Sequence, residues 1–108
     1  MILKIDSTVT NHIVVQLIDP KVNKIDKLVQ KQKLGSQVLL PMIVKILKKN
    51  KVDFSDLTAV EVNPGPGSFT GTRVGVSVAN ALGFALNIPI NKKKGKIVIP
   101  VYEKSKFD

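Results

Sequence analysis

A glycine-rich segment, NPGPGSFTGTRVG at residues 63–75, holds the residues best suited to binding a ligand. A turn of this kind that leads into a helix leaves backbone N–H groups free at the helix start, and these can hold an anion. Alternatively, the glycines let a helix and a sheet approach closely, while Ser68 or Thr70 caps the helix. Composition favours this packing interpretation. We call the segment the motif turn, and its candidate residues are Gly65, Gly67, Ser68, Phe69, Thr70, Gly71 and Arg73.

Three familiar sites are excluded by the spacing within the motif turn. A phosphate-binding P-loop has the pattern G-x-x-x-x-G-K-[ST], whereas Gly65 and Gly71 have five residues between them and are followed by Thr-Arg. A dinucleotide fingerprint requires glycine where Thr70 stands. A nucleophile elbow requires glycine two positions on either side of Ser68, but Pro66 and Thr70 occupy those positions.

Arg73 is the single arginine among seventeen basic residues. A position that keeps arginine in a chain so rich in lysine indicates a need for a planar, bidentate donor. The expected partner is a carboxylate or a phosphate. The alternative is a surface arginine without a specific role.

The remaining polar residues predict no catalytic set. His12 is the single histidine and lies within a strand pattern, and the only glutamates are Glu61 and Glu103. The Asp6–Thr8 turn follows the first strand, where a carboxylate could lie near a phosphate or a metal. One carboxylate forms neither an acid–base pair nor a metal cage. We therefore predict no catalytic residue, no metal site and no cofactor.

The elements that position these residues follow from hydrophobic periodicity and turn residues. Ser36 is the expected N-cap of the first helix, and Pro100 indicates an edge position for the last strand. We expect an α/β fold with a mixed five-stranded sheet in the order βββαβαβ, forming a single domain over residues 1–108. It includes a lysine-rich loop at 91–96 and a frayed tail at 103–108. The expected strands span 2–6, 13–18, 24–31, 58–63 and 97–102, and the expected helices span 37–50 and 70–87.

Both predicted helices are apolar over more of their circumference than a single sheet needs. The second carries no charge between Val74 and Leu86, and small residues recur in it at every fourth position. Such a ridge lets another backbone approach closely. An exposed apolar surface usually marks a partner, although the two helices could instead cover only each other. The residues expected at a partner or homodimer contact are Leu39, Ile43, Gly71, Gly75, Val78, Ala79, Leu82 and Gly83.

The composition of the chain excludes further classes of protein and of site. The chain has 108 residues, a net charge of +9 and no cysteine, which excludes disulfides and thiolate metal sites. No apolar run reaches the length of a membrane span, and the sequence shows no signal peptide, so we expect a cytoplasmic protein. Lysines cluster only at 48–51 and 92–96. Solvated lysines explain the charge better than a dedicated nucleic-acid site does, although charge of this size helps RNA approach.

The motif turn, together with Asp6-Ser7-Thr8 and Leu40-Pro41, resembles the bacterial TsaB family, also called YeaZ, over roughly residues 1–90. The resemblance implies a ribonuclease H-like domain of the actin/Hsp70/sugar-kinase type. It implies that Asp6, Ser7 and Thr8 form a degenerate phosphate loop. The family's chain is longer and has a second, similar domain, and a histidine common before its first helix aligns with Gly35.

The resemblance implies a noncatalytic partner of the TsaD ligase, which acts with TsaE to make threonylcarbamoyl-adenosine in tRNA. It implies pairing through the first two helices, as a homodimer or with TsaD, and only indirect contact with tRNA. Two alternatives stay open. One is a nucleotide-binding, kinase-like half-domain, and the other is a stand-alone basic RNA-binding module.

Overall fold

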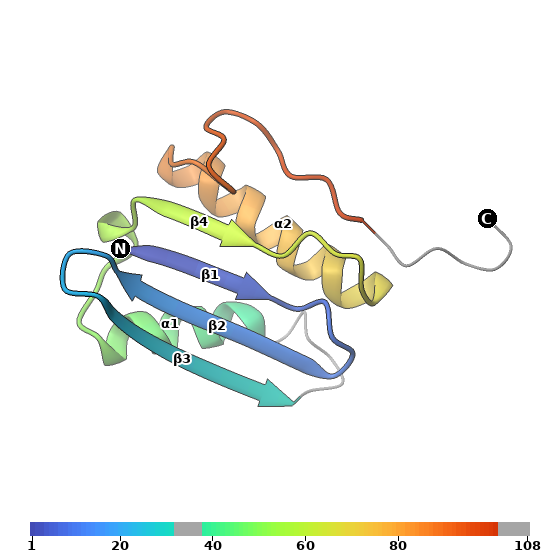
Figure 1. Ribbon diagram of the computed structural model, residues 1–108, viewed down its shortest axis with the longest axis horizontal. Coiled ribbons are helices and arrows are strands. Elements are labelled where there is room, and N and C mark those ends of the chain that lie inside the picture. Colours follow the sequence, from blue (N-terminus) through green and yellow to red (C-terminus); the bar gives the residue numbers. More distant parts are fainter. Residues whose placement is uncertain (32–37, 102–108) are drawn as a thin grey trace, which may run out of the picture.

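Four strands of the computed structural model, which describes residues 1–31 and 38–101, form one mixed sheet in the order β3-β2-β1-β4 (Figure 1). β1 pairs antiparallel with β2 and parallel with β4, and β2 pairs antiparallel with β3. The α/β arrangement and the mixed sheet are therefore as expected. The elements are β1 (Ile2–Asp6), β2 (His12–Asp19), β3 (Lys24–Lys31), α1 (Leu39–Lys49), a 3-10 helix η2 (Phe54–Asp56), β4 (Ala59–Val62) and α2 (Phe69–Leu86).

The hydrophobic core lies between the sheet and the two helices, which share one face of it. In Figure 1, α1 lies beneath β2 and β3, while α2 runs along β4. Because side chains alternate along a strand, every second residue of each central strand points toward the helices. The fully buried side chains at the centre of the core are Leu3, Val15, Leu39, Ile43, Ile46 and Val60.

The opposite face of the sheet, which we call the open face, carries the other half of each strand's side chains. Strand register aligns them in rows across the sheet. One row is entirely apolar and consists of Ala59, Ile2, Ile18 and Ile25. The next row is polar and consists of Glu61, Lys4, Gln16 and Lys27. Within it, Lys4 Nζ lies 3.6 Å from Glu61 Oε2.

The expected fifth strand is absent from the described residues, because other groups already occupy the free edge of β4. Ile90 forms a parallel bridge with Val60. The Asn91 amide N–H donates to Val60 O at 2.9 Å. The Asn91 side chain then accepts from Val62 N at 2.8 Å and donates to Val62 O at 3.0 Å. These bonds satisfy backbone groups that a fifth strand would otherwise have paired.

The segment at 97–101 instead lies against α2 and the motif turn. The Val98 N–H donates to Asn80 Oδ1 at 2.8 Å, and Asn80 Nδ2 donates to Val98 O at 2.9 Å. The Val101 N–H donates to Pro64 O at 2.6 Å. The prediction of a strand over 97–102 was wrong in the described part of this segment, and the sheet has four strands. The tail expected at 103–108 lies outside the described residues.

The helix boundaries differ slightly from the expected ones. Helix α1 begins at Leu39 with Val38 as its N-cap, whereas a start at about residue 37, which lies outside the described residues, was expected. Ser36 lies outside the described residues. Helix α2 begins at Phe69, and its N-cap is Ser68. None of the helices in the described part of the chain has the length and apolar character needed to cross a membrane.

The ridge of small residues on α2 faces the molecule's own sheet. Ala79 is fully buried, and Gly75 and Gly83 are buried as well. A methyl group added at Gly75 would collide with Ser7 Oγ, and one added at Gly83 would collide with Ile90. The interpretation of this ridge as an exposed seam was therefore wrong. Close approach is needed, but the approaching backbone belongs to the same domain.

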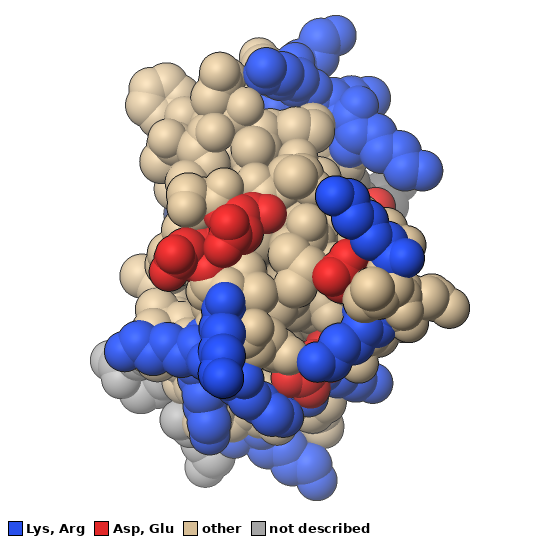
Figure 2. Space-filling model, turned by 90° about the vertical axis from the view of Figure 1, so that its left-hand side faces the viewer, with Lys and Arg blue, Asp and Glu red and all other residues tan. Residues whose placement is uncertain are grey.

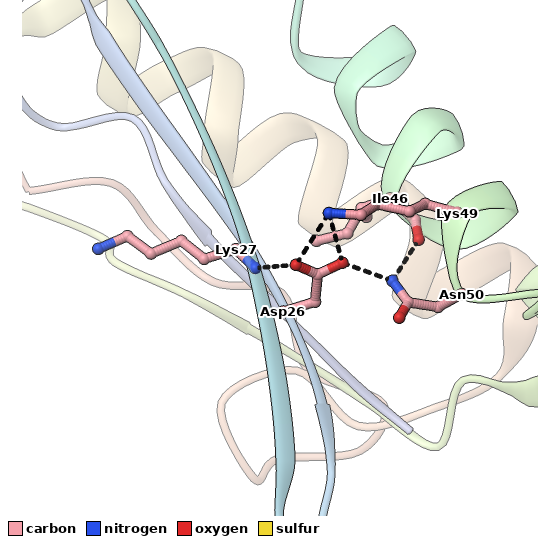
Figure 3. A network of polar contacts seen from close by, with 5 residues as sticks. All are labelled: Asp26, Lys27, Ile46, Lys49 and Asn50. Atoms are coloured by element: carbon pink, nitrogen blue, oxygen red, sulfur yellow. Dashed lines mark hydrogen bonds and ion pairs between the residues drawn. The ribbon is translucent and has the colours of Figure 1, made fainter.

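The edge strand β3 is held to the end of α1 by a polar network around Asp26 (Figure 3). Asn50 Nδ2 donates to Asp26 Oδ2 and to Ile46 O, each at 2.8 Å. The Lys27 N–H donates to Asp26 Oδ1 at 2.8 Å, and Lys49 Nζ lies 3.4 Å from Asp26 Oδ2. The hydrogen bond from Asn50, followed by that from the Lys27 amide, lowers the pKa of Asp26 from its ordinary value of 3.8.

Ala79→Arg should unfold the domain, because it forces a charged side chain into the fully buried contact between α2 and the sheet. An unpaired buried charge costs several kcal/mol, a large share of the stability of a small domain. Circular dichroism should show loss of the cooperative thermal transition. Ser77→Arg is the matched control, because Ser77 is exposed on the same helix. A folded Ala79→Arg protein would contradict the packing described here.

Asp26→Asn should lower the melting temperature by a few degrees at neutral pH, because it removes the charge but keeps the shape. Since folding lowers the pKa of Asp26, the ionised form stabilises the fold above pH 3.8, and this contribution is lost as the pH falls through the lower, folded value. Thermal melts of wild type and variant should therefore converge below pH 3.8. Asp19→Asn, at the end of β2, is the control, and a difference independent of pH would count against the network.

Candidate functional site

The motif turn lies directly against the loop that follows β1. The Ser68 N–H donates to Thr8 O at 2.8 Å, and Ser7 Oγ donates to Gly71 O at 2.6 Å. Both Ser7 and Thr8 are buried by this contact. The structure thus brings together the two segments that the sequence singled out separately, at the end of β1 and at the start of α2.

The glycines of the motif turn have no side chains, and this lets the turn lie close to the loop after β1. A Cβ added at Gly67 would lie 2.5 Å from Thr8 Cβ and 2.6 Å from Thr8 O, and one at Gly71 would collide with Ser7 O. Gly65 adopts a φ of +106°, which favours glycine, and its N–H donates to Asn63 Oδ1 at 3.1 Å. The geometry supports the packing interpretation of the glycines. Ser68 stands at the N-cap, but its hydroxyl forms no capping bond.

The carboxylate of Asp6 is occupied by bonds within the site. Its Oδ1 accepts from the Thr8 N–H at 3.0 Å and the Thr8 hydroxyl at 2.7 Å, and its Oδ2 accepts from Asn63 Nδ2 at 3.1 Å. Burial by itself raises the pKa of Asp6, but the bonds from Thr8 and Asn63 outweigh it and lower the pKa. Asp6 is therefore held ionised as a turn residue that joins the ends of β1 and β4.

Other chemistry at this site is sparse. Among the described residues, no group of three or more His, Asp or Glu side chains could hold a metal ion. In the same part of the chain, the hydroxyl of Thr72 is the one buried side-chain polar atom without a hydrogen-bond partner. His12 lies half-buried at the start of β2. The described residues therefore show how the site is held together and offer no acid–base pair.

Arg73 and Phe69 form an exposed pair one turn apart on α2. The guanidinium carbon of Arg73 lies 5.2 Å from the centre of the Phe69 ring, a cation–π distance. Arg73 forms no ion pair with another described residue, so its expected carboxylate or phosphate partner stays a prediction. The ring contact orients the guanidinium at the surface of the helix, where its donors can meet a partner.

The outer faces of the helices are the apolar surfaces available to a partner. Leu40 is 49% exposed on α1 and Phe69 is 58% exposed on α2. Two shallow hollows lie on these faces, one lined by Leu40, Pro41, Val44, Lys45 and Lys48, the other by Thr70, Arg73, Val74, Ser77 and Val78.

Of the expected contact residues, Leu39 and Ile43 are fully buried, whereas Val78 and Leu82 are half-buried against the core. Sequence analysis did not single out Leu40, Val44 and Val74 as contact residues. The available signal was their spacing of one helical turn from other apolar residues.

The comparisons with known proteins agree on one family. The family model described as "TsaD: tRNA N6-adenosine threonylcarbamoyltransferase" matches residues 24–92. The chain is 45% identical over 51 residues to the tRNA threonylcarbamoyladenosine biosynthesis protein TsaB of Buchnera aphidicola subsp. Baizongia pistaciae, covering 47% of this chain and 23% of that protein. It is 36% identical over 55 residues to TsaB of Escherichia coli, covering 51% and 24%.

Two further similarities extend this result. The chain is 46% identical over 52 residues to the tRNA N6-adenosine threonylcarbamoyltransferase of Nitrosospira multiformis, covering 48% of this chain and 15% of that protein. The solved structure of YeaZ from Pseudomonas aeruginosa superposes with a TM-score of 0.77 at 27% identity, covering 94% of this chain and 44% of YeaZ. The matched region is thus about a quarter of each TsaB relative and less than half of YeaZ.

Gly75→Ala should destabilise the fold by about 1–3 kcal/mol, because the new methyl group collides with Ser7 Oγ. In a Ser7→Ala background the hydroxyl is gone, and the same substitution should cost less. Urea denaturation of the four proteins in this cycle measures the coupling. Ser77→Ala is the control for helix propensity on the exposed face. Equal costs of Gly75→Ala in both backgrounds would show that the two residues do not meet.

Proposed function

This chain belongs to the family described as tRNA N6-adenosine threonylcarbamoyltransferase (TsaD), and from that premise we propose that it is a TsaB-like, noncatalytic partner of a TsaD-like ligase. The observation that carries the proposal is its similarity to proteins named for tRNA threonylcarbamoyladenosine biosynthesis, together with the superposition on YeaZ. The proposal includes the ribonuclease H-like class, of the actin/Hsp70/sugar-kinase type, and a cytoplasmic setting.

The outer faces of α1 and α2 support a role in binding a protein partner. Both helices bury one side in the core and still present apolar side chains outward, among them Leu40 on α1 and Phe69 on α2. Exposed apolar surface that spans adjoining elements is typical of an interface. We propose that these faces pair with the TsaD-like ligase, or with a second copy of the chain when the ligase is absent. TsaE and tRNA would then be met through that complex.

A catalytic role has less support. A kinase-like half-domain would use the loop after β1 to bind phosphate, but there the Asp6 carboxylate is bonded to Thr8 and Asn63, and Ser7 is buried beneath Gly71. A ligand would have to displace these bonds. We therefore propose that the site is structural, and that the motif turn shapes and orients α2 for the partner.

Leu40→Asp should abolish co-purification with the TsaD of the same genome, because it places a carboxylate in the apolar outer face of α1. A carboxylate buried without a partner in an apolar interface costs several kcal/mol, which corresponds to at least a tenfold loss of affinity. Val22→Asp is the matched control, because Val22 is also an exposed aliphatic residue but lies in the β2–β3 turn. The measurement is tagged co-purification with and without added tRNA, followed by calorimetric titration.

Arg73→Lys provides a second variant for the same experiment, because it keeps the charge but loses the planar fork. It should weaken the complex more than Lys45→Ala does. Retention of full binding by both Leu40→Asp and Arg73→Lys would overturn the proposed interface, provided that circular dichroism shows both variants folded. Failure of the wild-type chain to bind TsaD would overturn the proposed partner itself.

A further inference from the structure

Phe84 is the most exposed large hydrophobic residue of the described chain, with 91% of its surface open to solvent. It lies in the last turns of α2, well away from the Phe69–Arg73 pair at the start of that helix. A fully solvated phenylalanine ring on a well-formed helix gains nothing from the core of its own domain. Its ring is therefore available for contact with another molecule.

A hollow of about 240 Å³ adjoins the Phe84 ring. Its apolar lining includes Ile88, Ile90 and Ile97, and its polar lining includes Asn87 and Lys96. No carboxylate is among its lining residues. The hollow is suited in size to a flat ring rather than to a helix, and it offers an apolar surface with polar groups around it.

Four exposed lysines follow directly in the chain, at 92, 93, 94 and 96. The turn that carries them is anchored to the sheet, because Ile90 and Lys93 exchange backbone hydrogen bonds of 3.3 and 3.0 Å and Asn91 is bonded to Val62. None of the four forms an ion pair with another described residue. Figure 2 shows basic side chains at the top of this end of the molecule, standing apart from the carboxylates, most of which lie lower.

We propose that Phe84 and the lysine turn at 92–96 form a binding surface for single-stranded RNA. One base stacks on the Phe84 ring beside the hollow, and the lysines contact the neighbouring phosphates. Stacking on an aromatic ring and neutralisation of phosphates are the two contacts by which proteins hold single strands. A ring-sized hollow, rather than an extended groove, favours a nucleotide over an acidic peptide.

This inference goes beyond the proposed function, which has the chain meet RNA only through its partner. The surface lies at the far end of α2 from the motif turn, and the family model ends at residue 92. Direct RNA binding needs no TsaD, so the two proposals can fail independently.

Phe84→Ala should weaken binding of a fluorescein-labelled single-stranded oligouridylate about 5- to 100-fold, which corresponds to the loss of one stacked base. The measurement is fluorescence anisotropy of the full chain over a range of salt concentrations. The salt dependence should stay unchanged in this variant, because every lysine still meets its phosphate. Phe69→Ala is the matched control, since it removes the exposed ring at the other end of α2 and should leave binding unaltered.

Replacing the four lysines at 92, 93, 94 and 96 by glutamine should instead reduce the salt slope, by about 0.7 for each phosphate that is no longer neutralised. Glutamine at four other exposed lysines, Lys21, Lys24, Lys27 and Lys31 in β3 and the turn before it, gives the control for net charge. Unaltered binding by Phe84→Ala would overturn the proposal. Equal affinity for an RNA duplex, or full displacement of the RNA by polyglutamate at equal charge concentration, would also overturn it, because either would show binding by charge alone.

Discussion

The close contact between the loop after β1 and the first turns of α2 is the constraint on which the rest of the structure depends. It requires the absence of side chains at Gly67, Gly71 and Gly75, each of which faces Ser7 or Thr8. Because that contact fixes the distance between α2 and the sheet, it also determines which residues of the helix are buried. The face opposite the glycines is consequently left outward, with Arg73 and Ser77 on it. Core packing and the candidate interface are thus two results of one contact.

Much of the sheet could be predicted from the sequence, because alternation and turn residues mark β1 to β4 directly. The glycine spacing also revealed that something approaches α2 closely. It could not reveal what approaches, because a small residue is required equally by a neighbouring strand and by a partner helix. Only the positions of Ser7 and Ile90 show that the neighbour is internal. The exposed apolar residues that were not singled out, such as Leu40, lie beside buried ones and share their apolar character.

The edge of β4 could not be predicted, because one asparagine side chain pairs with it in place of a strand, while a second, on α2, holds the segment that was expected to form that strand. Asn91 bonds the backbone of Val62, and Asn80 bonds that of Val98. An amide can donate and accept as a peptide group does, but its partner depends on a fold that periodicity does not specify. An apolar run such as residues 97–101 therefore resembles a strand in sequence while it packs elsewhere. In the same way, Phe84 has the apolar character of a core residue and is exposed.

The open face of the sheet has a consequence for how the protein behaves in solution. Its apolar row of Ala59, Ile2, Ile18 and Ile25 favours association with other apolar surfaces, while the net charge of +9 makes two copies of the molecule repel each other. At physiological ionic strength that charge acts over about 8 Å and keeps two molecules from meeting face to face, whereas at 1 M salt it acts over about 3 Å. Electrostatic repulsion between molecules therefore opposes association through this apolar row, and added salt weakens that repulsion. Anionic polymers would neutralise the same positive charge. The ionic composition of the surroundings therefore decides whether the apolar row stays exposed to solvent.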